Sequence, residues 1–192
     1  MLIDCSRGHM LTELDTNADL AALVRTIPDF PKPGILFRDV STLLLDGKGF
    51  RTAIDRLIAT FDPAEVDLIA GVEARGFIVA SALSYALSKG KIMLRKSGKL
   101  PGVAVGIDYA LEYGSDRIEM HVGAVAPGTR VLLVDDLIAT GGTALAGVKL
   151  LRGEGALVHD ARFLVDLPDL GGAARLREAG VATRALIAFA GH

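Results

Sequence analysis

The sequence has little of several things that mark whole classes of protein. Cys5 is the only cysteine among 192 residues, which excludes an internal disulfide and makes the reducing cytoplasm the expected location. Aromatic residues make up 5% and the formal net charge is −2. The chain therefore lacks the basic, aromatic-rich surface of a dedicated nucleic-acid binder. No apolar run approaches the roughly 20 residues of a membrane span, and residues 1–15 lack the charged start and apolar core of a secretion signal.

The sequence is rich in apolar residues, which form short strand-like segments and longer helical segments in alternation. They make up 51% of the chain, and its length suits a single domain. Apolar strand segments alternate with helical segments, which predicts right-handed crossovers and a doubly wound α/β sheet covered on both faces. We expect helices over 18–26, 48–61, 77–87 (buried on all sides) and 173–178, and strands over 67–72, 92–94, 161–165 and 184–189. A further strand should begin at 131 and be followed by a helix that opens at the turn 139–143. We also expect an irregular proline-rich segment over 27–39 and a hairpin with arms at 103–111 and 117–122.

The most specific pattern is VLLVDDLIATGGT at 131–143. Four apolar residues run into Asp135 and Asp136, and the small residues of 139–143 then open a helix. Small residues let backbone N–H groups close around a phosphate at a helix N-terminus, and paired carboxylates suit ribose hydroxyls. A plain turn or helix cap accounts equally well for each part taken alone. The whole string lacks the P-loop lysine and the dinucleotide G-x-G-x-x-G spacing, and it predicts a sugar-phosphate site.

Charged segments follow two other predicted strands, at 73–76 and 95–102, and a third lies in the hairpin at 111–114. Ligands bind at the carboxyl ends of strands in such sheets, so we expect the two segments that follow strands to converge with Asp135 and Asp136. Cations beside a phosphate turn would neutralise a second polyanion such as pyrophosphate, although a solvated face is the alternative for a charge run and a surface ion pair for Arg75. Glu112 suits acid–base work from a closing loop, or is an ordinary hairpin-tip glutamate.

Five blocks in this order resemble the adenine phosphoribosyltransferases, within the type I phosphoribosyltransferase family. They are PKPGILFRD at 31–39, GVEARGF at 71–77, RKSGKLPG at 95–102, LEYGSDRIEMH at 111–121 and VDDLIATGGT at 134–143. The resemblance implies an α/β fold with a mostly parallel twisted sheet flanked by helices. It also implies a small N-terminal hood at about 18–45 and a flexible hairpin lid at about 95–121. Residues 1–17 would form a poorly ordered extension before a single domain over 18–192.

The resemblance further implies a reaction, the transfer of 5-phosphoribose from phosphoribosyl pyrophosphate (PRPP) to adenine, which gives AMP and pyrophosphate in purine salvage. Mg²⁺ would be held mainly by PRPP, pyrophosphate and water, in a homodimer. Catalytic roles are implied for Glu112, Asp135 and Asp136, and a cis peptide for Glu73-Ala74. The implied substrate-binding residues are Leu36, Phe37 and Arg38 at the adenine, Glu73, Ala74, Arg75, Arg95, Lys96 and Lys99 beside the pyrophosphate, Tyr113 in the lid, and Ala139, Thr140, Gly141, Gly142 and Thr143 at the 5′-phosphate.

Two alternatives stay open at this point. One is a phosphoribosyltransferase for another purine base, such as xanthine or hypoxanthine, and the other is a PRPP-sensing regulator that binds nucleic acid. The acidic balance of the chain and the lid residue Glu112 weigh against the regulator. Met93-Leu94 stands where many relatives have a proline, which leaves the local geometry of the following basic loop open.

Overall fold

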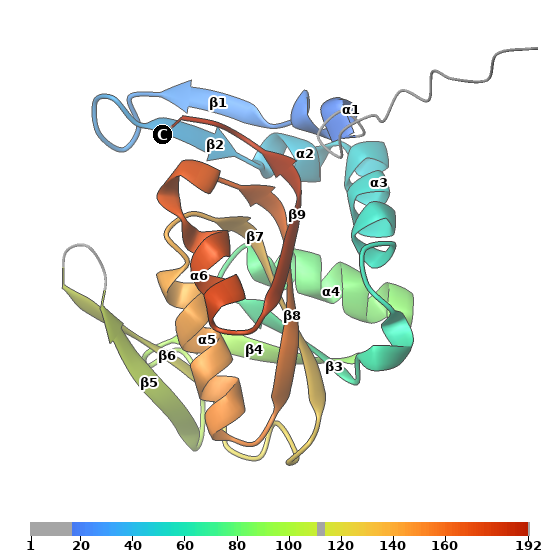
Figure 1. Ribbon diagram of the computed structural model, residues 1–192, viewed down its shortest axis with the longest axis vertical. Helices are drawn as coiled ribbons and strands as arrows, with labels where there is room; N and C mark the ends of the chain where they lie inside the picture. The colour runs from blue at the N-terminus through green and yellow to red at the C-terminus, as the bar shows by residue number, and fades with distance from the viewer. Residues whose placement is uncertain (1–16, 111–113, 192) are drawn as a thin grey trace, which may run out of the picture.

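The computed structural model describes residues 17–110 and 114–191 (Figure 1). The strands are β1 (Arg25–Pro28) and β2 (Leu36–Asp39) in a two-stranded sheet, and β3 (Leu68–Val72), β4 (Gly90–Lys96), β5 (Ala104–Ala110), β6 (Ser115–His121), β7 (Arg130–Ile138), β8 (Leu157–Asp166) and β9 (Ala182–Ala188) in a seven-stranded sheet. The helices are α1 (Ala18–Ala21), α2 (Ser41–Leu45), α3 (Gly47–Ile58), α4 (Gly76–Leu87), α5 (Gly142–Gly153) and α6 (Gly172–Glu178), with 3-10 turns η2 (Pro63–Glu65) and η3 (Pro168–Leu170). No helix in the described ranges is long and apolar enough to cross a membrane.

The large sheet has the strand order β5-β6-β4-β3-β7-β8-β9. Strands β4, β3, β7, β8 and β9 are parallel neighbours, and the antiparallel hairpin β5–β6 extends the sheet beyond β4. The predicted doubly wound α/β fold is therefore confirmed. Because the five parallel strands share one direction, the segments that follow β3, β4 and β7 emerge at the same edge.

The sheet is covered on both faces, with α3 and α4 on one side and α5 and α6 on the other (Figure 1). Successive side chains of a strand point to opposite faces. Ile69 and Leu132 accordingly pack in the cluster with α3 and α4, whereas their neighbours Ala70 and Leu133 pack in the cluster with α5. This double burial accounts for the nearly continuous apolar runs of β3 and β7.

The N-terminal segment differs from the prediction in two places. The helix expected over 18–26 ends at Ala21, and the proline-rich segment 27–39, expected to be irregular, contains strand at both ends. β1 and β2 pair antiparallel, with Ile27 opposite Phe37. Pro28 is tolerated because it is the last residue of β1, an edge strand that does not need its missing N–H for a further ladder. We call α1, the β1–β2 hairpin and α2 together the hood.

Two further predictions concern α4 and the β5–β6 hairpin. The hairpin lies where it was expected and is confirmed in the described residues. The prediction that the apolar helix over 77–87 is buried on all sides is wrong. Only the face that carries Val79 and Leu83 packs on the sheet, whereas Ile78 is 44% exposed and Tyr85 is 90% exposed. Apolar composition alone does not distinguish a helix buried on all sides from one that exposes an apolar face to solvent.

Candidate active site

The turn between β7 and α5 forms the floor of the site. β7 ends at Ile138, Gly141 adopts φ +77°, and α5 begins at Gly142. A cavity of about 140 Å³, lined by Asp135 and residues 137–144, opens at this turn. The first N–H groups of α5 have no partner inside the helix, and the helix dipole favours an anion there. The predicted turn of small residues thus lies at the carboxyl end of the central strand, with a cavity beside the N-terminus of a helix.

Hydrogen bonds from α6 hold this turn in place, a feature that the sequence analysis missed. Gly172 N–H donates to the Ala139 carbonyl at 3.0 Å, and Arg175 Nη1 donates to the Thr140 carbonyl at 3.0 Å. A Cβ on Gly172 would lie 2.3 Å from the Ala139 oxygen and 2.7 Å from the Gly141 nitrogen. Only glycine fits this backbone-to-backbone approach. The adjacent glycines at 171–172 are the one sequence signal that could have pointed to it.

The two carboxylates lie beside Arg75, which comes from the loop between β3 and α4. Arg75 Nε lies 2.7 Å from Asp136 Oδ2, and the Asp136 side chain is 7% exposed. Asp135 Oδ1 accepts the Asp136 N–H at 2.8 Å. Burial of its carboxyl, reinforced by the neighbouring Asp136 charge, raises the pKa of Asp135 well above its ordinary value. The approach depends on Gly76, where a Cβ would lie 2.5 Å from Asp135 Oδ1.

The loops after β3 and β4 are joined through Glu73. Its carboxylate pairs with Arg95, with both nitrogen–oxygen distances 3.2 Å, and accepts the Lys96 N–H at 3.0 Å. Although burial opposes it, these donors lower the pKa of Glu73. Arg95 Nη1 also donates to the Lys99 carbonyl at 2.7 Å, and the peptide Glu73-Ala74 is cis, as the resemblance implied. Arg95 therefore holds the basic loop in place, with its guanidinium already engaged by the protein.

A chain of polar contacts links the basic loop to the phosphate turn across the hairpin. Lys96 Nζ lies 3.1 Å from Asp116 Oδ2 on β6, and this contact raises the pKa of Lys96. The Tyr109 hydroxyl on β5 donates to the same Asp116 oxygen and accepts from Thr143 Oγ1, each at 3.2 Å. Burial raises the pKa of Tyr109 and keeps its hydroxyl protonated. The hairpin is thus docked on the N-terminus of α5 through Tyr109 and Asp116, which sequence reasoning did not single out.

The hood places Phe37 above the loop that carries Arg75. The Arg75 guanidinium carbon lies 5.8 Å from the centroid of the Phe37 ring, and Phe30 meets that ring edge to face with centroids 5.1 Å apart. Leu36 and Arg38 flank Phe37 on β2 and are half-buried. Residues separated by a hundred positions in the sequence therefore converge at one edge of the sheet.

Most of the predicted site residues lie at this edge, namely Leu36, Phe37, Arg38, Glu73, Ala74, Arg75, Arg95, Lys96, Lys99, Asp135, Asp136, Ala139, Thr140, Gly141, Gly142 and Thr143. Glu112 and Tyr113 lie outside the described residues. Among residues 17–110 and 114–191, no three His, Cys, Asp or Glu side chains gather into a group that could hold a metal ion.

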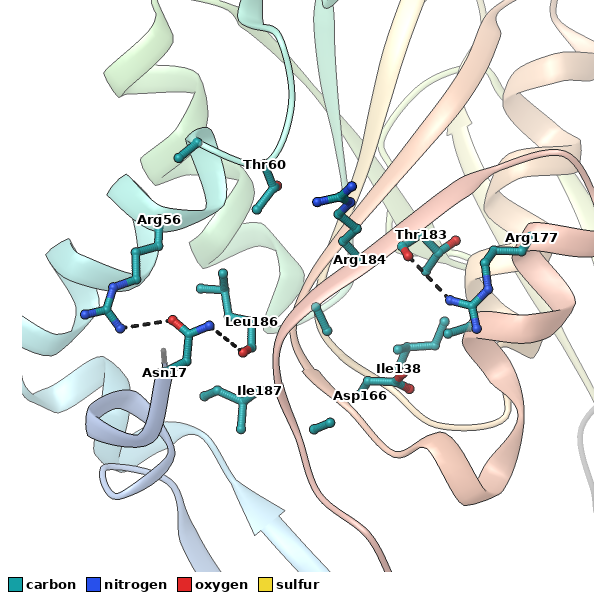
Figure 2. A pocket seen from close by; sticks show the side chains of 14 residues that line it. Asn17, Arg56, Thr60, Ile138, Asp166, Arg177, Thr183, Arg184, Leu186 and Ile187 are labelled. Atoms are coloured by element: carbon teal, nitrogen blue, oxygen red, sulfur yellow. Dashed lines mark hydrogen bonds between the residues drawn. The ribbon is translucent and has the colours of Figure 1, made fainter. Parts of the chain in front are cut away.

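A larger cavity than the one at the β7–α5 turn lies elsewhere among the described residues. It measures about 550 Å³ and wraps the free edge of β9 between α3 and α6 (Figure 2). Figure 2 shows Asn17 at its mouth, where Asn17 Nδ2 donates to the Leu186 carbonyl at 2.9 Å and Arg56 Nη1 donates to Asn17 Oδ1 at 3.0 Å. None of the predicted site residues lines this cavity.

Comparison with known proteins agrees with the geometry at the β7–α5 edge. The family model described as the phosphoribosyl transferase domain matches residues 42–167. The adenine phosphoribosyltransferase of Rhodopseudomonas palustris (strain BisB18) is 59% identical over 174 residues, which cover 91% of this chain and 87% of the relative. That of Bradyrhizobium sp. (strain BTAi1) is 60% identical, with 91% and 97% covered.

Solved structures show the same relationship in three dimensions. The crystal structure of adenine phosphoribosyltransferase from Rhodothermus marinus superposes with a TM-score of 0.83 at 42% identity and covers 92% of this chain and 98% of that one. The Saccharomyces cerevisiae enzyme, solved with adenine and an imino-altritol bisphosphate, gives a TM-score of 0.84 at 33% identity, with 90% and 99% covered. With a matching family model, close relatives along most of its length and the same fold, the chain belongs to the phosphoribosyltransferase family, among the adenine phosphoribosyltransferases.

Proposed function

We propose that this site transfers 5-phosphoribose from PRPP to adenine and releases AMP and pyrophosphate. One observation carries the proposal. The paired carboxylates Asp135 and Asp136 and the phosphate turn lie at the same edge as Arg75, whose guanidinium reaches both Asp136 and the ring of Phe37. A sugar phosphate, an anionic leaving group and a flat base can therefore be held side by side.

The reaction is a displacement at the anomeric carbon of the ribose. The bond from that carbon to the pyrophosphate oxygen breaks with its electron pair, a bond to the adenine N9 forms, and N9 loses its proton. Positive charge develops on the ribose ring in between. Asp135 and Asp136 would hold the ribose hydroxyls and stabilise that charge, because fixed carboxylates in a water-poor site need little reorganisation. Glu112 would act near the imidazole ring of the purine when the lid closes and excludes water.

The two ends of PRPP would be bound by different elements. The N–H groups and hydroxyls of residues 139–143 would hold the 5′-phosphate. Arg75, Lys96 and Lys99 would contact the pyrophosphate, with Arg95 beside them positioning the loop. Lys96 and Arg75 are paired with carboxylates in the structure, so PRPP would have to exchange those ion pairs for its own oxygens. Adenine would stack on Phe37, with the backbone of Leu36 and Arg38 reading its edge and Tyr113 in the lid above.

Mg²⁺ is the cofactor that we propose. When bound it would neutralise the leaving pyrophosphate and orient it against the ribose hydroxyls. Two adjacent carboxylates, one of them already paired with Arg75, do not form a protein cage for an ion. They fit an ion held mainly by substrate oxygens and water, which is how Mg²⁺ usually binds with phosphates.

The test is an assay of the purified protein with adenine, PRPP and Mg²⁺, monitored for AMP. We expect AMP formation with adenine and little product with hypoxanthine or xanthine. Asp135→Asn combined with Asp136→Asn should reduce turnover strongly, while Asp55→Asn, which alters an exposed carboxylate on α3, should not. Phe37→Ala should chiefly raise the KM for adenine. A preference for another base would reassign the substrate, and salt-sensitive nucleic-acid binding without turnover would indicate a regulator.

We also propose a homodimer in the cytoplasm. The exposed apolar face of α4 supports a dimer, because Ile78 and Tyr85 lie two turns apart on one side of the helix and are 44% and 90% exposed. The single cysteine supports a reducing compartment. Within the chain, 1–17 would be an extension, 18–192 one domain, and 95–121 the lid. Light scattering of the wild type and of Tyr85→Glu checks the dimer, since a buried charge at the interface should yield monomers.

A further inference from the structure

The helices of the hood are packed in the core, where Leu20 and Leu43 are buried against α3 and the large sheet, but its β1–β2 hairpin is joined to the rest of the molecule differently. β1 and β2 pair only with each other and do not join the seven-stranded sheet. A two-stranded hairpin is at best marginally stable by itself. Besides the packing of the hood helices, the orientation of β2 and of Phe37 therefore depends on side-chain contacts between β2 and the segments next to the large sheet.

The Arg38 side chain connects β2 to the C-terminal segment, 152 positions along the chain. Its guanidinium carbon lies 4.4 Å from the centroid of the Phe189 ring, and its Nη2 donates to the Ala190 carbonyl at 3.3 Å. Its Nη1 donates to Thr26 Oγ1 on β1 at 2.6 Å. One planar group thus bridges both strands of the hood and the C-terminal segment, a geometry that guanidinium provides and ammonium does not.

The C-terminal segment is itself fixed to the sheet. Phe189 follows β9 directly, and its N–H donates to the Asp166 carbonyl at the end of β8 at 3.1 Å. Gly191 N–H donates to Asp169 Oδ2 on η3 at 2.7 Å. In Figure 1 the red end of the chain runs beside β1 and β2. Arg38 therefore contacts a C-terminal segment whose position is fixed by its hydrogen bonds to the end of β8 and to η3.

We propose that Arg38 is a positioning residue, which acts with Phe189 to set the height and tilt of the hood over the base site. Adjacent side chains of a strand point to opposite faces, so Arg38 holds one face of β2 against the C-terminal segment while Phe37 presents the other toward Arg75. The inference deepens the proposed function, since it assumes that Phe37 stacks on adenine. It assigns the side chain of Arg38 a role separate from its backbone.

The experiment compares Arg38→Met, Arg38→Lys, Phe189→Leu and the double variant Arg38→Met/Phe189→Leu. Arg51→Met is the matched control, because Arg51 is an exposed arginine on α3 whose ion pair is with Asp55 one turn away. Steady-state kinetics give the KM for adenine, the KM for PRPP and kcat, and thermal unfolding shows that each variant is folded. Wild-type AMP formation is measured first, because its absence would refute the proposed function and not this inference alone.

We expect the adenine KM to rise about tenfold in Arg38→Met and in Phe189→Leu, with PRPP KM within about twofold of wild type. Arg38→Lys should not restore the adenine KM, because a compact ammonium cannot stack on Phe189 while donating to both other partners. The double variant should be no worse than the poorer single variant, as expected for two groups that act through one contact. The inference is wrong if AMP forms but the adenine KM of the single variants is unchanged, or rises together with the PRPP KM. It is also wrong if the effects of the two substitutions on the adenine KM add up in the double variant. Should Arg38→Met not fold, Phe189→Leu and Arg38→Lys decide it.

Discussion

Replacing Gly172 by alanine tests whether α6 really fixes the geometry of the phosphate turn. The added Cβ would lie 2.3 Å from the Ala139 oxygen and 2.7 Å from the Gly141 nitrogen. Both are backbone atoms, so no side-chain rotation relieves the clash. To restore ordinary contact, the turn and the start of α6 must separate by about 1 Å.

A shift of that size falls on the atoms proposed to bind the 5′-phosphate. Misplacement of a bound reactant by about 1 Å costs up to about 100-fold in rate. We therefore expect kcat/KM for PRPP to fall about 30- to 100-fold, which corresponds to about 2–3 kcal/mol. Overpacking should also lower the free energy of unfolding by about 1–3 kcal/mol. The adenine KM should change far less, because the Phe37 ring lies against Phe30 and Arg75, which do not belong to α6.

Steady-state kinetics with PRPP as the varied substrate, together with thermal unfolding, make the measurement. The control is Gly153→Ala at the end of α5, where a Cβ would meet nothing within 4 Å. It should retain both activity and stability. A Gly172→Ala enzyme that handles PRPP as well as the control does would refute the argument, whatever its stability.

Two further predictions concern the hood and the hairpin. Hydrogen bonding to the Ser41 side chain, pairing with Arg25 and a hydrogen bond from the Ser41 N–H lower the pKa of the buried Asp39 to about 2. Asp39→Asn should therefore lower the free energy of unfolding at pH 7 by about 1–2 kcal/mol. A depressed pKa stabilises the fold above the unfolded value of about 3.9, so the difference should shrink as the pH falls toward 2 in urea titrations, and a constant difference would contradict it. Tyr109→Phe removes the hydroxyl between Thr143 and the hairpin, and should raise the PRPP KM about threefold in steady-state assays while leaving the adenine KM unchanged.

Local sequence patterns predicted the secondary structure correctly where an element is buried on both faces. The apolar runs of β3 and β7 are buried on both faces, so composition alone identified them. The prediction failed at α4, where the apolar residues Ile78 and Tyr85 are exposed. It also failed in the hood, where the prolines led us to expect irregular structure although Pro28 ends the strand β1. In each case the structure of the segment depends on the neighbouring element that it packs against, and a local sequence pattern does not specify that neighbour.

Local stretches of sequence supply the chemical groups of the candidate site. The string from Asp135 to Thr143 carries carboxylates, small residues and a helix start within a few positions, a local pattern that suits an anion at the N-terminus of a helix. The tertiary structure decided which groups meet. Gly172 supports the turn, Arg75 reaches both Asp136 and Phe37, and Arg38 joins the hood to the C-terminal segment. These contacts join parts of the chain up to 152 positions apart, and only the packing of the sheet and its helices brings them within a few ångströms.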